Sequence, residues 1–181
     1  MDINQIIQID YYMILPLFIV GSLMHFAFEW SKHNRNMAVI AAVNESYWEH
    51  IKIAFWPMFI LYLVEFALGG WTIASFIPAK TVSLYVVIIF MIGSVFAYKS
   101  IAKKNILVLD ISLFCVTILV AQVIGSNLLI ELNASILTIL LSLLFLSAIL
   151  ISFIRFTLKP PLEPDIFKDP ITKKYGIKGH K

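Results

Sequence analysis

The stretch from His25 to His50 contains His25, Glu29, Glu45, Glu49 and His50, which are side chains that can bind a metal or transfer a proton. They fall between two very apolar segments, where ionisable groups are costly, so the cluster is by default a candidate functional site. Two imidazoles and one carboxylate around an open position form the ligand set of catalytic zinc and non-haem iron centres. On this interpretation His25 and His50 bind the metal, with Glu49, or else Glu29, as the carboxylate ligand. Glu29 or Glu45 then remains as the general base.

Other interpretations of the cluster stay open. The order His-x3-Glu followed by Glu-x3-Glu-His is not the His-Glu-x-x-His signature of metalloproteases. The same groups could carry a proton, a cation or a small ligand in a transport complex. In a structural or scaffold protein, the carboxylates would instead cap a helix and pair with nearby lysine and arginine side chains. Asn44, Ser46 and Asp110 are further candidates for lining the same pocket.

Helical spacing predicts how these residues are positioned. His25 and Glu29 are four residues apart, as are Glu45 and Glu49, so each pair is expected on one helix face. The first pair falls in the last turns of one predicted helix. The second pair falls in the first turns of the next helix, with Asn44 as its predicted N-cap. Antiparallel neighbours would bring both pairs to the same membrane edge, and the apolar run 37–43 between them is expected to enter the interface.

The composition indicates a membrane protein. The chain has 181 residues, of which 60% are hydrophobic and 14% charged, whereas soluble domains are roughly half apolar and a quarter charged. A helix crosses a bilayer with about 20 mainly apolar residues. Five segments meet this requirement and predict an all-α, polytopic domain over residues 1–157: Tyr11–Trp30, Ile51–Gly70, Val82–Tyr98, Ile106–Gly125 and Ile136–Phe156. Pro78 and Lys80 favour a loop before the third span, which is predicted to be the shortest.

Loop charges predict the orientation. With five spans, every lysine and arginine except Lys80 falls on one face, and basic loops face the cytoplasm. The N-terminus is therefore expected outside and the C-terminus in the cytoplasm. Glu65 is expected near the outer end of the second span, in contact with water, and Pro57 is expected to kink that span.

The tail, residues 158–181, contains four prolines and six lysines, which predicts an extended path. Its apolar residues favour folding back along the cytoplasmic face, where Asp165 and Asp169 could reach the cluster. Alternatively, its lysines hold it against anionic lipid. The tail lacks the interleaved arginines and aromatics of a nucleic-acid binder, so the expected partners are the lipid bilayer and a second copy of the chain.

Three runs are distinctive: GSLMHFAFEWSKHN, VNESYWEHIKIAFWP and the tail run PPLEPDIFKDPITKKYGI. They resemble a family of small bacterial integral membrane proteins of unknown function, and the resemblance covers the first two helices and the tail, about a third of the chain. The resemblance implies a multi-pass protein of the bacterial cytoplasmic membrane, and it points to the same corner between the first two helices. It implies no reaction.

Overall fold

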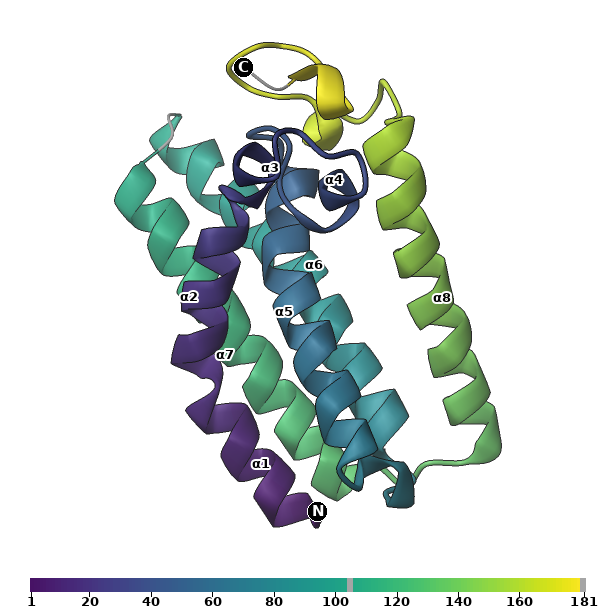
Figure 1. The fold of residues 1–181 in the computed structure, drawn as a ribbon. Helices are drawn as coiled ribbons and strands as arrows, with labels where there is room; N and C mark the ends of the chain where they lie inside the picture. The colour runs from purple at the N-terminus through teal and green to yellow at the C-terminus, as the bar shows by residue number, and fades with distance from the viewer. Residues whose placement is uncertain (104–105, 180–181) are drawn as a thin grey trace.

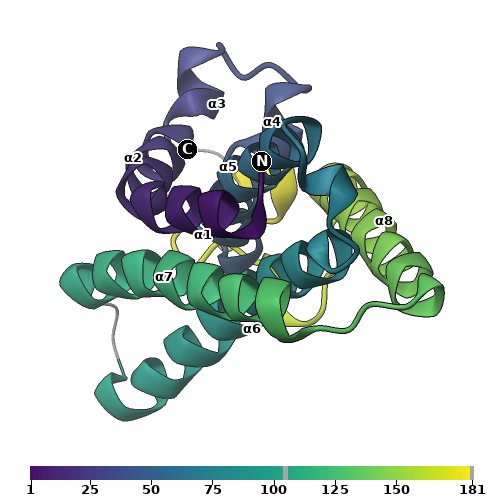
Figure 2. The same cartoon turned by 90° about the horizontal axis from the view of Figure 1, so that it is seen from below.

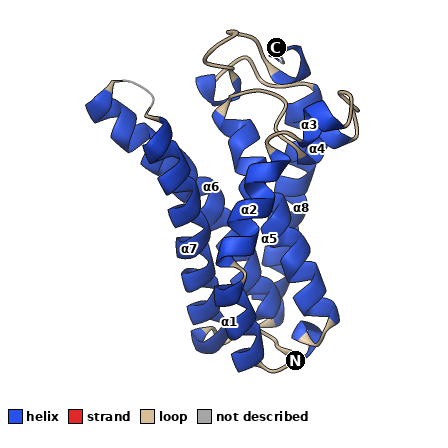
Figure 3. Ribbon diagram, turned by 60° about the vertical axis from the view of Figure 1, so that its left-hand side comes forward, coloured by secondary structure: helices blue, strands red, loops and turns tan. Residues whose placement is uncertain are grey.

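The computed structural model describes residues 1–103 and 106–179, and within this part the chain is helical, without β-strands (Figure 1). The α-helices are α1 (Ile3–Tyr12), α2 (Ile14–Met24), α3 (Ala27–Trp30), α4 (Met37–Ile40), α5 (Tyr47–Ala67), α6 (Phe76–Ala102), α7 (Leu107–Glu131) and α8 (Ile136–Leu158). Short 3-10 turns follow α5 and occur twice in the tail. Loops gather at the two ends of the long helices (Figure 3).

The described part of the chain contains helices and no β-strand, which confirms the all-α prediction. In the described part of the chain, α5, α6, α7 and α8 are each long and apolar enough to cross a membrane, and α1 with α2 forms a fifth, bent candidate. The long helices alternate in direction, so the N-terminus and the tail lie at opposite ends of the bundle (Figure 1). Seen along the bundle, α5 lies in the middle, with α2, α6 and α8 around it (Figure 2).

The first span differs from the prediction at both ends. It begins at Ile3, because Asp2 and Gln5 form a capping box. It bends by 51° between α1 and α2. Pro16 explains the break, since it has no N–H to donate to the Tyr12 carbonyl and its ring would clash with that carbonyl. The span then ends at Met24, short of the predicted Trp30.

The third span also differs: α6 has 27 residues, so it is the longest helix and not the shortest. Pro78 lies in its first turn, where a missing N–H breaks no helical hydrogen bond. Lys80 lies in the helix rather than in a loop, and its ammonium pairs with Asp10 and Glu65. The prediction that Glu65 contacts water is therefore wrong, because the residue is only 1% exposed.

A close contact between α2 and α5 sets the distance between the two helices that carry the histidines. α5 continues through Pro57, which cannot donate to the Ile53 carbonyl. Gly21 on α2 packs against this carbonyl: an added Cβ would lie 2.6 Å from Ile53 O and 2.7 Å from a ring atom of Phe114. Because Gly21 precedes His25 by about one helical turn, its lack of a side chain lets His25 approach α5.

We expect Gly21→Ala to destabilise the protein by about 1–3 kcal/mol, the usual cost of overpacking a core. A backbone oxygen and a ring held between two helices cannot both move aside. The measurement is thermal unfolding in detergent. Gly93→Ala is the control, because nothing lies within 4 Å of a Cβ added there. Equal melting temperatures for the two variants would contradict the close contact.

The tail folds back over the end of the bundle that carries α3 and α4, as predicted (Figure 1). Phe167 is buried and packs against Trp48 and Phe156, with ring centroids 5.1 and 5.3 Å apart. Asn44 Nδ2 donates to the Gly176 carbonyl at 2.9 Å. The tail is thus packed into the protein through both apolar and polar contacts.

Candidate metal centre

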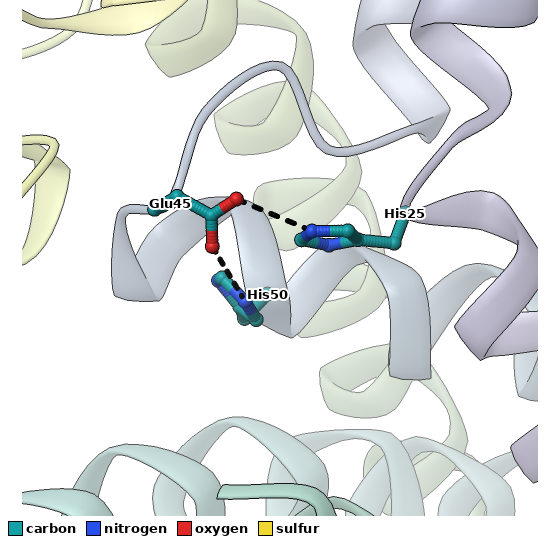
Figure 4. A group of neighbouring side chains, drawn as sticks. All are labelled: His25, Glu45 and His50. Carbon is teal, nitrogen blue, oxygen red and sulfur yellow. Dashed lines mark ion pairs between the residues drawn. The ribbon is translucent and has the colours of Figure 1, made fainter. Parts of the chain in front are cut away.

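Three of the five predicted residues come together at one end of the bundle: His25, Glu45 and His50 (Figure 4). His25 Nε2 lies 3.3 Å from Glu45 Oε1, and His50 Nε2 lies 3.7 Å from Glu45 Oε2. One ligand atom from each residue lies within 4.8 Å of the other two. The side chains are 28%, 41% and 35% exposed, respectively, so a small molecule could reach the cluster.

Three different elements position these groups. His25 directly follows α2, and His50 lies in the first turn of α5. Glu45 lies in the loop before α5, because the helix begins at Tyr47 with Ser46 as its N-cap. The predicted N-cap, Asn44, is wrong by two residues. Glu45 and Glu49 therefore do not share a helix face, and Glu45 alone turns toward the histidines.

The Glu45 loop is held by the tail. The Glu45 backbone N–H donates to Asp169 Oδ2 at 3.0 Å, and Asp169 Oδ1 accepts from the amides of Ile171 and Thr172. Asp169 is 1% exposed, so it links the tail to the loop from the interior. Asp169 was predicted to reach the cluster, and it does so through the backbone of Glu45 rather than through the cluster's side chains. Asp165, in contrast, has an 81% exposed side chain and pairs with Lys168.

The hydrogen bond of His50 decides which of its nitrogens faces the cluster. Its Nδ1 lies 2.9 Å from the Ser46 carbonyl, and a carbonyl only accepts, so Nδ1 carries the proton. In the neutral ring, Nε2 then presents a lone pair toward Glu45 Oε2. Metal-bound histidines typically donate their other ring N–H to a carbonyl in this way. Two acceptors that face each other favour a cation between them.

On the other side of Glu45, a proton lies between the carboxylate and His25. The hydrogen bond to Glu45 raises the pKa of His25 above its ordinary value, and the negative charges of Glu45 and Glu29 add to this effect against the opposing cost of burial. His25 therefore holds a proton to higher pH than a free histidine and donates it to Glu45. A metal ion must displace this proton, so metal affinity would decrease as the pH falls.

Glu49 does not join the cluster. It is 1% exposed, lies 2.5 Å from Lys52 Nζ and accepts from the Val43 N–H at 3.0 Å. Lys52 also donates to the Ala38 carbonyl at 2.7 Å and to Thr157 Oγ1 at 2.9 Å. The pair thus ties the apolar run 37–43 to α5 and α8. In this structure Glu49 stabilises the loop and is not placed as a ligand.

Two of the remaining candidates lie outside the triad. The chain turns between α2 and α3, so Glu29 does not share a helix face with His25, and its side chain is exposed. It acts on His25 through its charge. Asp110 accepts a hydrogen bond from the Tyr98 hydroxyl.

The last two candidates shape the loop. Ser46 supplies the carbonyl that orients His50. Asn44 Oδ1 accepts from the Ser46 N–H at 2.8 Å, while its Nδ2 holds the tail at Gly176. None of these hydrogen bonds is made to a side chain of Glu45 or His25. Asn44 and Ser46 therefore contribute by fixing the backbone of the loop that carries Glu45.

Comparison with known proteins gives a family. A family model described as "Family of unknown function (DUF6512)" matches residues 1–177. The chain belongs to this family. The match confirms the resemblance to a family of unknown function, and membership in DUF6512 extends it from three runs to nearly the whole chain. No curated protein and no solved structure matches the chain, so any activity must be argued from the site.

Proposed function

We propose that this chain is an integral membrane protein that binds a divalent metal ion, zinc or iron, through His25, Glu45 and His50, and that the bound metal serves hydrolysis. The observation that carries the proposal is the convergence of two imidazoles and one carboxylate, with the lone pair of His50 aimed at Glu45. Compared with the ligand set expected from the sequence, Glu45 replaces Glu49.

The spacing of the donors fits a metal of this size. Bonds of about 2.0–2.1 Å to nitrogen and oxygen place neighbouring ligand atoms roughly 3.3–3.5 Å apart in a tetrahedral site. The His–Glu separations are 3.3 Å to Glu45 Oε1 and 3.7 Å to Glu45 Oε2. One ligand atom from each of the three residues lies within 4.8 Å of the other two, so the side chains would have to close in by rotation to complete the set. Three protein ligands in a partly exposed site leave a position for water or substrate, which is typical of catalytic rather than structural metal sites.

The chain's own residues have distinct roles in this proposal. The metal would supply Lewis acidity toward water or toward a carbonyl or phosphoryl oxygen. Ser46 keeps Nε2 of His50 free to bind, and Asp169 holds the backbone of Glu45. We assign the general base to Glu29, because it is exposed and close enough to influence the charge of His25.

We further propose that the bundle spans a membrane with its N-terminus outside. In the five-span topology, the described lysines and arginines other than Lys80 fall on the side that carries the candidate metal centre. Basic loops favour the cytoplasm, so this side is assigned to the cytoplasm. Reporter fusions after Gly70 and after Lys181 are expected to report outside and cytoplasm, respectively. Reports from the same side would contradict a five-span topology.

Metal analysis of the purified protein tests the proposed site. We expect about one zinc or iron per chain in the wild type, and loss of that metal in His50→Ala and Glu45→Gln. Removing one of three protein ligands leaves too few donors to hold the ion against chelators. His33→Ala is the matched control, since His33 lies at the same end but outside the triad. Wild-type protein without bound metal after zinc or iron loading would contradict the proposal.

The assignment of the base requires a separate variant. Glu29→Gln is expected to retain the metal but to lose hydrolysis of an ester or phosphodiester probe presented in lipid vesicles, because it removes proton transfer and keeps all three ligands. Full turnover in this variant would exclude Glu29 as the base while leaving the metal site intact.

A further inference from the structure

A second group of ionisable residues lies at the opposite end of the bundle from the metal centre. Asp10 on α1, Glu65 on α5 and Lys80 on α6 meet around one nitrogen. Lys80 Nζ lies 2.5 and 2.7 Å from the two oxygens of Asp10 and 2.8 Å from Glu65 Oε2. Sequence reasoning missed this group, because Asp10 and Lys80 lie 70 residues apart and both fall just outside the spans predicted to begin at Tyr11 and Val82.

The three side chains are removed from solvent. Asp10 is 0% exposed, Glu65 1% and Lys80 3%. Two carboxylates and one ammonium carry a formal charge of −1 when all are ionised. An uncompensated charge is very costly in such surroundings, and in practice the group neutralises instead. Charge balance therefore requires one proton shared between the two carboxyl groups.

No other cation in the described part of the chain is in contact with these carboxylates. From α7, Ser126 Oγ donates to Asp10 Oδ2 at 3.1 Å, and Gln122 Nε2 donates to the Asp10 carbonyl at 3.3 Å. From α5, the Tyr62 ring lies 4.3 Å from Lys80 Nζ, and its hydroxyl donates to Gln122 Oε1 at 2.7 Å. These neighbours are neutral, so they do not balance the second carboxylate.

The hydrogen bonds indicate which carboxyl group holds the proton. Both oxygens of Asp10 accept from Lys80, and one also accepts from Ser126. The Lys80–Glu65 contact is short enough for an ion pair but has no hydrogen-bond geometry, and Glu65 Oε1 has no hydrogen-bond partner among the described residues. Donors stabilise the ionised form, so Asp10 is the carboxylate and Glu65 the carboxylic acid.

An almost entirely apolar cavity lies beside the network. It has a volume of about 180 Å³, lies between α5, α6 and α8, and its wall includes Tyr62, Lys80 and Leu143. Apart from Lys80, Tyr62 and Thr81, the wall is apolar. Lys80 is thus the one member of the ionisable group that touches both Glu65 and the cavity.

We propose that Asp10, Glu65 and Lys80 form a proton-binding site, in which Glu65 holds one exchangeable proton and Lys80, its ion-pair partner, relays it. On release, an Nζ–H bond of Lys80 breaks and its proton goes to water, while the Glu65 proton moves to Nζ. The site then holds one ammonium and two carboxylates, and uptake reverses both transfers. This site is separate from the metal centre, and its function would be the reversible binding and release of one proton.

Infrared spectroscopy of the full-length protein in nanodiscs tests the proposal. The C=O stretch of a protonated carboxyl group should be present at neutral pH, should shift in D₂O, and should disappear on titration to alkaline pH. Carboxyl ¹³C labelling of glutamate should shift this band, whereas labelling of aspartate should not. Glu65→Gln should remove the band, since it leaves the neutral pair of Asp10 and Lys80. Metal content should be unchanged in this variant.

Two further variants keep the test decisive. Asp10→Asn should also remove the band, because Glu65 then ionises against Lys80. Glu131→Gln removes an exposed carboxyl group at the end of α7 and should leave the band in place. Absence of the band in the wild type, its persistence in Asp10→Asn, no shift in D₂O, or a shift on aspartate labelling would each overturn the proposal. If Glu65→Gln does not fold, the labelling result and Asp10→Asn decide.

Discussion

Lys52→Met is expected to lower the free energy of unfolding by about 3–5 kcal/mol, the usual cost of removing one partner from a buried ion pair. Lys52 is 0% exposed and Glu49 is 1% exposed, so the carboxylate would remain buried without its ammonium. The Ala38 carbonyl and Thr157 would also lose their donor. Chemical unfolding in detergent, followed by tryptophan fluorescence, measures the loss.

The double variant Lys52→Met/Glu49→Met separates the ion pair from general packing. Replacing both partners with apolar groups of similar size often restores stability, although the Val43 N–H would still lack the acceptor that Glu49 supplies. Lys32→Met is the control, because Lys32 is exposed at the same end. A Lys52→Met protein as stable as this control would show that Glu49 is free for another role, including metal binding.

Phe167→Ala should affect both stability and the metal centre, and it is the second change with a large expected effect. Truncating a buried phenylalanine costs about 3–5 kcal/mol, and Phe167 is 6% exposed between Trp48 and Phe156. Trp48 lies between Glu45 and His50 in the chain, so a cavity beside it would loosen both ligands. We expect a lower melting temperature and at least a tenfold weaker zinc affinity by competition with a chelator.

Leu162→Ala is the matched control for the tail, because Leu162 is 70% exposed. It should change neither the melting temperature nor the zinc affinity. If Phe167→Ala behaves like Leu162→Ala, the tail does not support the site, and binding of its lysines to anionic lipid becomes the better account of its role.

Hydropathy and charge were enough to predict the helical class, the apolar segments that form α5 to α8, and the end of the bundle where the histidines lie. These properties add up along the chain: about 20 apolar residues cross a bilayer wherever they occur, and each crossing reverses the direction. His25 and His50 flank the loop between two consecutive crossings, so two antiparallel helices bring them to the same end. The return of the tail followed similarly from its apolar residues.

Helix boundaries and partners depended on tertiary contacts. One residue along a helix turns a side chain by about 100°, so the start of α5 at Tyr47 rather than Glu45 decides that Glu45 meets the histidines. Glu49 is withdrawn from the site by Lys52, one turn along α5.

The buried group at the other end depends on packing even more strongly. From the sequence, Asp10, Glu65 and Lys80 would each be predicted to lie at the surface, because a single charge without a partner is stable only near water. They are buried because three helices bring them within ion-pair distance, 2.5 Å for Asp10 and 2.8 Å for Glu65 from the same nitrogen. Such mutual neutralisation is a property of the assembled bundle and of no single segment.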